Sequence, residues 1–352
     1  MVGELVKIVK IRIYIFFVFL FILTGCNNSL EKDSLRNISE GSLIGKMDKN
    51  ETFSWKGIPF AAPPIGDLRW KAPQPVESWS GIFEASEFKS ACFQGSSGIQ
   101  GDSNEKWSGD EDCLYLNIWT PRFTQDEIVN RQDKLPVMMW IHGGGNTVGS
   151  AHVYDPSLLV STHDVIVVTI HYRMGSLGWF RHPALHNINA SKEDKSGNYG
   201  TLDTIKALEW IKENIQNFGG DPNNVTVFGE SAGGHNAAAI FASPMADGLY
   251  HKVIIQSGIM SSASIAASES YLPENGVAPS ISGLETFNRI LIANGMASDL
   301  NDARLKQDKM PDYEIRSILY DTDPDILLQA SRDSRPKRSG MTRVYPDGYV
   351  IY

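Results

Sequence analysis

The chain has 352 residues, of which 42% are hydrophobic and 21% charged. It is long enough to bury a sizeable core, as one large domain or two smaller ones. Its formal net charge is −9. Nucleic-acid-binding proteins present a basic surface, so we expect no nucleic-acid partner for this acidic chain.

The first 25 residues have the pattern of a signal peptide. Basic residues come first, at Lys7, Lys10 and Arg12. The apolar run 13–23 is too short to favour a membrane-spanning helix. It ends in Leu-Thr-Gly-Cys, which resembles the lipobox of bacterial lipoproteins, with Cys26 as the lipidated residue. We expect an exported chain, lipid-anchored to a bacterial cell membrane on its periplasmic or cell-surface side. The alternative is a plain signal peptide with an incidental cysteine.

The remaining chain divides into a tether and a folded part. Residues 26–41 are polar with few large apolar side chains, which predicts a flexible tether. Residues 42–352 are predicted to belong to one α/β domain. Within it, the segment between Cys92 and Cys113 is rich in Gly, Ser and Asp and cannot build its own core. In an oxidising compartment a disulfide closing it would stabilise the fold by roughly 3 kcal/mol. Two buried free thiols are the alternative.

Strand and helix patterns alternate along this domain. Residues 42–57 alternate weakly, which predicts an antiparallel hairpin at a sheet edge. Apolar runs predict strands at 111–121, 136–142, 164–172 and 252–257, the last three buried on both faces. Helical patterns cover 198–218, 284–294 and 325–330. The alternation predicts an α/β fold with a doubly wound, mostly parallel sheet.

A serine stands between a strand pattern and a helix pattern at residues 225–240. The β-branched run from Val225 leads into Gly-Glu-Ser-Ala-Gly, and an alanine-rich run follows. In this context G-x-S-x-G predicts a nucleophile elbow, where two glycines leave room for a sharp turn and Ser231 Oγ points outward. The N–H of Ala232 would face developing negative charge at the helix N-terminus. The alternative is an ordinary turn, because Gly and Ser are common in turns.

A second glycine cluster lies upstream. The tetrapeptide His-Gly-Gly-Gly at residues 142–145 follows the apolar run 136–142. Glycine amides can approach a carbonyl oxygen closely, so this loop predicts the other half of an acyl-transfer site.

These motifs resemble those of the type-B carboxylesterases, the α/β-hydrolase group that includes cholinesterases and bacterial para-nitrobenzyl esterases. The matching segments are 57–69, 111–117, 142–145 and 218–233, and the resemblance runs from about residue 42 to the end. It implies an α/β-hydrolase fold that hydrolyses small carboxylic esters without a metal or organic cofactor. It further implies Ser231 as the acyl-enzyme nucleophile, an oxyanion hole and the family's first disulfide. The resemblance assigns the oxyanion hole to the N–H groups of Gly144, Gly145 and Ala232, and the disulfide to Cys92 and Cys113.

Two positions depart from the family pattern. Asn146 stands where members usually carry an aromatic residue, so that side of the pocket is not predicted. Trp107 lies nearer to Cys113 than the choline-stacking tryptophan of cholinesterases lies to its cysteine. We therefore do not assign a choline-stacking role to Trp107, and expect its ring to pack in the protein or contact solvent.

The serine also needs a base and an orienting carboxylate. Only His235 and His251 follow Ser231 in the sequence, and neither is predicted to be the base. His142 is predicted to be structural. Family members are longer, and residues 345–348 resemble a segment that shortly precedes the family's acid, so Asp347 is not the predicted acid. We expect a C-terminally truncated chain that lacks the triad acid, the triad histidine and the last sheet strands.

Three functions are consistent with these observations. The first is an impaired serine carboxylesterase. The second is a non-catalytic cholinesterase-like binding or adhesion module on the same fold. The third is a non-functional esterase fragment. Intact Ser231, Gly144 and Gly145 favour the enzyme, because a binding module has no need of them.

Overall fold

A computed structural model describes residues 32–96, 105–186, 189–259, 261–271, 281–332 and 343–352. The predicted signal peptide and the predicted lipidation site Cys26 lie outside these residues. Within the described ranges, no helix combines the length and apolar character needed to span a bilayer.

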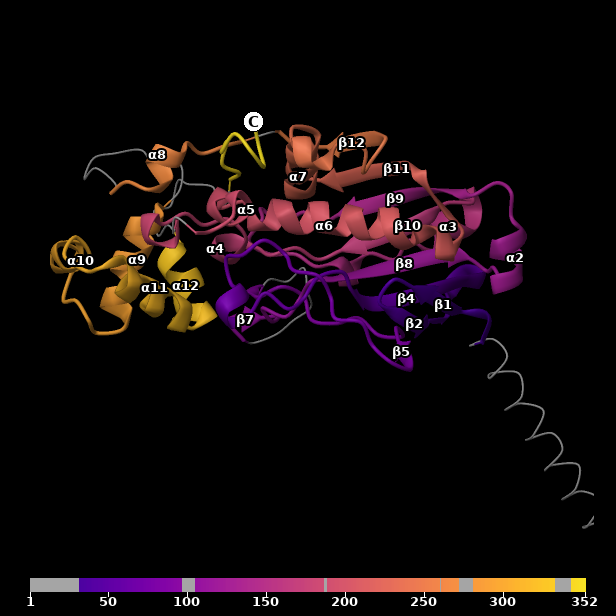
Figure 1. Ribbon diagram of the computed structural model, residues 1–352, viewed down its shortest axis with the longest axis horizontal. Coiled ribbons are helices and arrows are strands. Elements are labelled where there is room, and N and C mark those ends of the chain that lie inside the picture. The colour runs from indigo at the N-terminus through magenta and orange to yellow at the C-terminus, as the bar shows by residue number, and fades with distance from the viewer. Residues whose placement is uncertain (1–31, 97–104, 187–188, 260, 272–280, 333–342) are drawn as a thin grey trace, which may run out of the picture.

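The main sheet has seven strands in the order β12-β11-β9-β10-β8-β4-β3 (Figure 1). Strands β12, β11, β9 and β10 run parallel, and β8, β4 and β3 pair antiparallel beyond them. The hairpin β3–β4 is the antiparallel edge predicted for residues 42–57. The strands are β3 (Lys46–Asp48), β4 (Thr52–Pro59), β8 (Tyr115–Pro121), β9 (Leu135–Ile141), β10 (Ile166–Ile170), β11 (Gly220–Glu230) and β12 (Lys252–Gln256).

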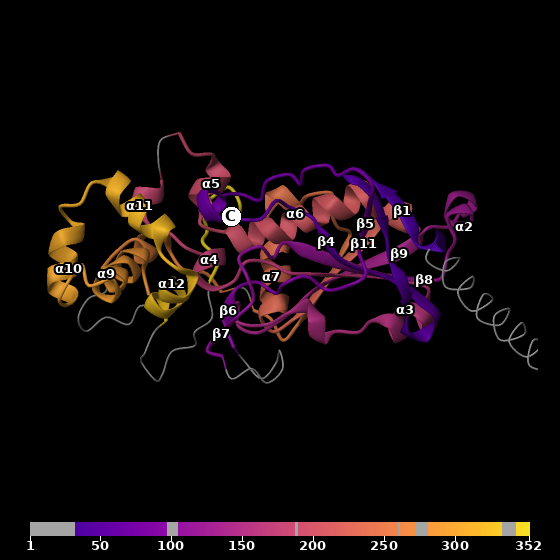
Figure 2. The same cartoon turned by 90° about the horizontal axis from the view of Figure 1, so that it is seen from below.

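Most of the helices belong to one of two groups. Helices α3, α6 and α7 lie against the main sheet, whereas α9 to α12 gather at the end of the molecule opposite α2 (Figures 1 and 2). The helices are α2 (Gln125–Asn130), α3 (Ser157–His163), α4 (Gly175–Gly178), α5 (Lys192–Ser196), α6 (Tyr199–Asn214), α7 (Ala232–Phe241), α8 (Ile265–Ser268), α9 (Gly283–Ala293), α10 (Leu300–Gln307), α11 (Asp312–Asp321) and α12 (Pro324–Ser331).

Helices cover both faces of the sheet. Successive side chains of a strand point to opposite faces. On β10, Val168 belongs to the main core cluster together with Leu208 of α6. The preceding Val167 instead packs in a separate cluster with Val160 of α3. Helices α6 and α3 therefore lie on opposite faces, which is the doubly wound arrangement that the sequence predicts.

The fold begins within the segment predicted as a tether. Strand β1 (Leu35–Ile38) pairs with β2 (Gly41–Ile44), which pairs with β5 (Ile82–Glu84) in a small second sheet. Arg36 is fully buried, and its guanidinium donates to Phe123 O at 2.8 Å. The tether prediction is thus wrong for residues 35–41. Composition missed β1 because backbone pairing and a buried arginine, rather than a run of apolar side chains, hold it in place.

Strand β12 lies at the edge of the main sheet. The sequence predicts it as buried, but Ile254 is 44% exposed and Ile255 is 43% exposed. Among the described residues only β11 pairs with it. The apolar run identified the strand correctly. Burial of Ile254 and Ile255 would need a further strand beside β12, and the described part of the chain contains none there.

We predict that this edge makes the chain self-associate, because unpaired backbone groups beside exposed isoleucines template pairing with another strand. The change Ile255→Lys should raise the soluble monomer fraction in sedimentation velocity. The matched control is Leu158→Lys, at an apolar position on α3 that is 66% exposed, and it should change little. A monomeric parent chain with a sharp, reversible unfolding transition would contradict the prediction.

Candidate active site

The two predicted halves of the site leave neighbouring strands at the same edge of the sheet. Strands β9 and β11 are parallel neighbours, with Gly229 opposite Ile141. The next residues are Ser231 after β11 and the glycine loop 142–149 after β9. Strand β9 lies between β10 and β11, so the strand order reverses here. In open α/β sheets, ligands bind at the carboxyl ends of strands at such a switch point.

Ser231 sits in a strained turn between β11 and α7. Its φ of 56° and ψ of −117° lie in a region that residues with a Cβ rarely adopt. Two backbone hydrogen bonds hold it there. Ser231 N–H donates to Gln256 O, and His235 N–H donates to Ser231 O, each at 2.9 Å. The side chain is exposed and does not cap α7. The hydroxyl is therefore presented at the surface of the turn.

Three glycines permit the close approach of β9, β11 and α7. A Cβ on Gly229 would lie 2.5 Å from Gly233 O, and one on Gly233 would overlap Ile141 O. A Cβ on Gly143 would lie 3.3 Å from Ser231 Cβ. No larger residue fits these positions without moving backbone. The glycine loop is thus directly beside the serine.

The glycine loop offers unused amide donors. Gly144 and Gly145 have φ values of 109° and 68°, and Gly144 O accepts from Val148 N–H at 3.1 Å. Within the described ranges, the N–H groups of Gly144, Gly145 and Ala232 donate to no acceptor in the protein. Backbone donors of this kind stabilise the oxyanion of an acyl-transfer intermediate.

A pair of asparagines joins the glycine loop to α7, the helix that follows Ser231. Asn146 is fully buried with a φ of 58°. Its Nδ2 donates to Asn236 Oδ1 at 3.3 Å, and Asn236 Nδ2 donates back to Asn146 Oδ1 at 2.9 Å. Gly175 N–H also donates to Asn146 O at 2.6 Å. Asn146, where the family usually has an aromatic residue, is therefore a buried link between the loop and α7.

His142 holds the start of the loop. Its ring stacks on Tyr172 with 4.5 Å between centroids, and its Nδ1 donates to Gly143 O at 2.9 Å. Tyr172 Oη donates to His142 O at 2.7 Å. Burial lowers the pKa of His142 to about 4, so the ring is neutral at neutral pH. These contacts agree with the structural role predicted for His142.

The two histidines after Ser231 are engaged elsewhere. His235 Nδ1 contacts Ile259 O and accepts from Ser261 N–H at 3.1 Å, and burial lowers the pKa of this ring. His251 Nδ1 accepts from Val225 N–H at 3.2 Å. Neither ring hydrogen-bonds to Ser231 in the described structure.

Asp347 has a structural role as well. Its carboxylate accepts the N–H groups of Val350 and Ile351, at 3.1 and 2.9 Å. These bonds close the turn at residues 347–351 and use the oxygens that a triad acid would offer to a histidine.

The disulfide loop supports the far end of the glycine loop. Cys92 and Cys113 form the predicted disulfide. Next to Cys92, β6 (Gln94–Gly95) pairs with β7 (Trp107–Ser108). Gln94 Nε2 donates to Gly149 O at 2.8 Å, and Gly149 N–H donates to Gln94 Oε1 at 2.7 Å. Sequence reasoning missed both Gln94 and Asn236, because an isolated amide carries no motif.

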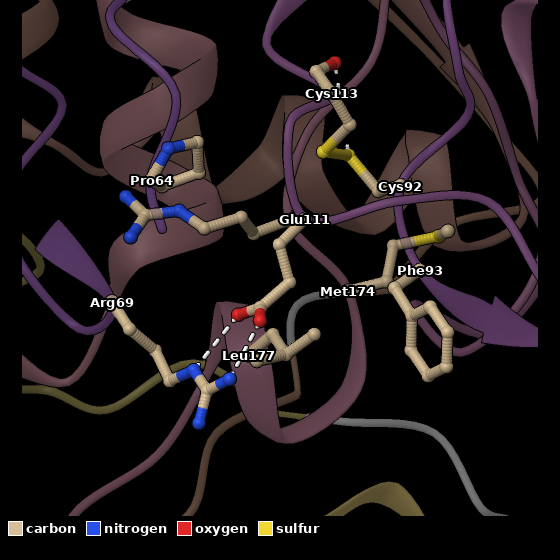
Figure 3. Close-up of a pocket in the computed structure, with 9 residues that line it drawn as sticks. Pro64, Arg69, Cys92, Phe93, Glu111, Cys113, Met174 and Leu177 are labelled. Atoms are coloured by element: carbon tan, nitrogen blue, oxygen red, sulfur yellow. Dashed lines mark hydrogen bonds and ion pairs between the residues drawn. A yellow bond between two sulfur atoms is a disulfide. The ribbon is translucent and has the colours of Figure 1, made fainter. Parts of the chain in front are cut away.

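A small cavity beside the disulfide is lined by an ion pair that holds the surrounding segments together (Figure 3). Arg69 donates to both carboxylate oxygens of Glu111, at 2.8 and 2.6 Å, and to Thr322 O at 2.7 Å. The cavity has a volume of about 10 Å³, room for one water molecule and too little for an ester. The described residues also contain no cluster suited to a metal ion.

Comparisons with known proteins agree with this geometry. A family model described as "Carboxylesterase family" matches residues 32–278. A pyrethroid hydrolase, Ces2e of Rattus norvegicus, is 42% identical over 236 residues, covering 64% of this chain and 39% of that protein. Carboxylesterase 1D of Rattus norvegicus is 37% identical over 283 residues, covering 77% of this chain and 48% of that protein.

Solved structures show the same likeness. A PNB esterase superposes with a TM-score of 0.70 and 31% identity, over 91% of this chain and 58% of that one. A Geobacillus stearothermophilus carboxylesterase gives a TM-score of 0.68 and 31% identity, over 90% of this chain and 57% of that one. The fold and site thus define an α/β hydrolase, and the chain belongs to the carboxylesterase family. It spans less than half the length of these two curated relatives.

We predict that the asparagine pair is energetically coupled. Replacing either Asn146 or Asn236 with alanine removes both hydrogen bonds between the two buried amides, and should lower the free energy of unfolding by about 1–3 kcal/mol. The double variant should lose less than the sum of the single losses. Urea unfolding of the parent and the three variants measures this, and additive losses would contradict the pairing.

Proposed function

We propose that the chain carries the nucleophile half of a serine carboxylic ester hydrolase. Ser231 Oγ attacks the ester carbonyl, the alcohol leaves with a proton, and water then hydrolyses the acyl-Ser231 to the carboxylic acid. The observation that carries the proposal is the exposed, strained Ser231 beside the unused amides of Gly144, Gly145 and Ala232. Family membership supports it.

The amides account for the electrostatic part of catalysis. As the carbonyl oxygen becomes an oxyanion, the donors of Gly144, Gly145 and Ala232 stabilise charge that is absent in the ground state. One such donor is worth about 2.7–4 kcal/mol in serine hydrolases. The covalent chemistry needs no metal or organic cofactor, because the serine is the nucleophile and water is the second substrate.

No residue described in the 352-residue chain is identified as the base that accepts the proton of Ser231. Its two histidines after Ser231 bond to the backbone at residues 225, 259 and 261. A serine hydroxyl without a base is a poor nucleophile. We therefore propose that this polypeptide hydrolyses esters weakly or not at all. Weak or absent hydrolysis is also what a non-catalytic binding module on the same fold would show.

A fluorophosphonate probe and p-nitrophenyl acetate together test the proposal. Slow labelling that Ser231→Ala abolishes, with little turnover, is the expected result. The matched control is Ser161→Ala, at an exposed serine on α3, and it should label like the parent. Turnover at an ordinary esterase rate that Ser231→Ala removes would overturn the impairment. Absence of any labelling at Ser231 would overturn the hydrolase proposal and favour a binding module.

We also propose that the protein is exported and held at a bacterial membrane by lipidation of Cys26. The support is the signal-like segment before Cys26 and a disulfide, which persists in oxidising compartments. The full chain expressed in bacteria should partition into a detergent phase, and Cys26→Ser should shift it to the aqueous phase. Equal partitioning of both forms would contradict the anchor.

A further inference from the structure

A second site lies away from Ser231, between α9, α12 and β7. These elements line an open groove of about 350 Å³, a volume that can hold a small ligand. Among the described residues, its lining includes the cations Lys106, Arg289 and Arg332 and one carboxylate, Asp325. The whole chain carries a net charge of −9, so an excess of positive charge in one groove is a local feature that attracts anions.

The cationic groups are held in position by the protein. The Arg332 guanidinium lies 4.7 Å and the Lys106 ammonium 5.2 Å from the centroid of the Trp107 ring. Trp107 stacks in turn on Phe93, with 5.9 Å between ring centroids. Arg289 Nη1 donates to Arg332 O at 2.8 Å, which fixes the end of α12. Packing against an aromatic face orients a cation without neutralising it.

Two of these cations keep their hydrogen-bond donors available. In the part of the chain that the structure describes, neither Lys106 nor Arg332 forms an ion pair or a side-chain hydrogen bond. The backbone of β6 makes room for one of them, since a Cβ on Gly95 would overlap Arg332 Nη2. A guanidinium and an ammonium presented together are suited to a carboxylate or phosphate.

The rest of the groove is partly apolar. Ala293, Ile326 and Ala330 contribute aliphatic surface next to the cations. A ligand that matches both features has an anionic group on a short apolar body.

We propose that this groove binds a small organic anion, with its carboxylate or phosphate at Arg332 and Lys106 and its apolar body against α9 and α12. The proposal does not depend on the chemistry at Ser231. Strand β6 connects the two places, because Gly95 lies under Arg332 and the adjacent Gln94 holds Gly149 of the glycine loop.

Ligand-observed fluorine NMR tests the proposal on the full chain. The probe para-fluorobenzoate should show saturable line broadening, and the neutral para-fluorobenzyl alcohol should show none. Competition with inorganic phosphate separates affinity for the anionic group from affinity for the apolar body. Full displacement of the probe at similar concentration means that charge alone is recognised, which would overturn the part of the proposal that places an apolar body in the groove. Weak displacement supports recognition of both parts.

Charge variants locate the site. Arg332→Gln and Lys106→Gln should each weaken binding of para-fluorobenzoate by about two- to fivefold. Asp325→Asn should strengthen it, because a carboxylate that lines the groove beside the cations is lost. Lys309→Gln removes an exposed cation elsewhere, on the chain after α10, and Ser231→Ala removes the proposed nucleophile. Both controls should bind like the parent. Equal broadening by the neutral alcohol, or binding that Arg332→Gln and Lys106→Gln leave unchanged, would overturn the proposal.

Discussion

The candidate active site depends on how closely β9, β11 and α7 approach one another. Gly229 and Gly233 face the backbone at Ile141, and no side chain fits between them. This contact forces the turn that gives Ser231 its positive φ. It also brings the end of β9 beside the serine, so that the same constraint places Ser231 and the glycine loop together. Backbone strain of this kind persists only where the surrounding structure over-determines it.

Several polar contacts then keep the glycine loop in place from different directions. Asn146 joins it to α7, Gln94 joins its far end to the disulfide loop, and Tyr172 bonds to its first residue. Each contact is a buried hydrogen bond, and removing one partner takes a bond from the other in a place that water does not reach easily. Within the described residues the amides of Gly144, Gly145 and Ala232 donate to no acceptor, and these contacts hold in place the segments that carry them. Catalysis by preorganised dipoles requires donors that are held in place.

The sequence was sufficient for the parts of the fold that rest on local patterns. The apolar runs predicted β9 and β10, the 3.6-residue period predicted α6, and G-x-S-x-G predicted the turn at Ser231. Features that rest on distant partners were not predictable. Strand β1 is only four residues long, two of them polar, and depends on pairing with β2. Burial of β12 depends on a further strand, and Asn236 has a recognisable role only opposite Asn146. The groove at Trp107 likewise combines residues from three separate segments.

We infer that Ser231 Oγ and the glycine-loop amides converge on one oxyanion position. A high-resolution crystal structure of the chain with a phosphonate bound at Ser231 measures this directly. The phosphonyl oxygen should lie within about 3 Å of the amide nitrogens of Gly144, Gly145 and Ala232. A phosphonyl oxygen directed into solvent, with those amides bonded elsewhere in the protein, would contradict it.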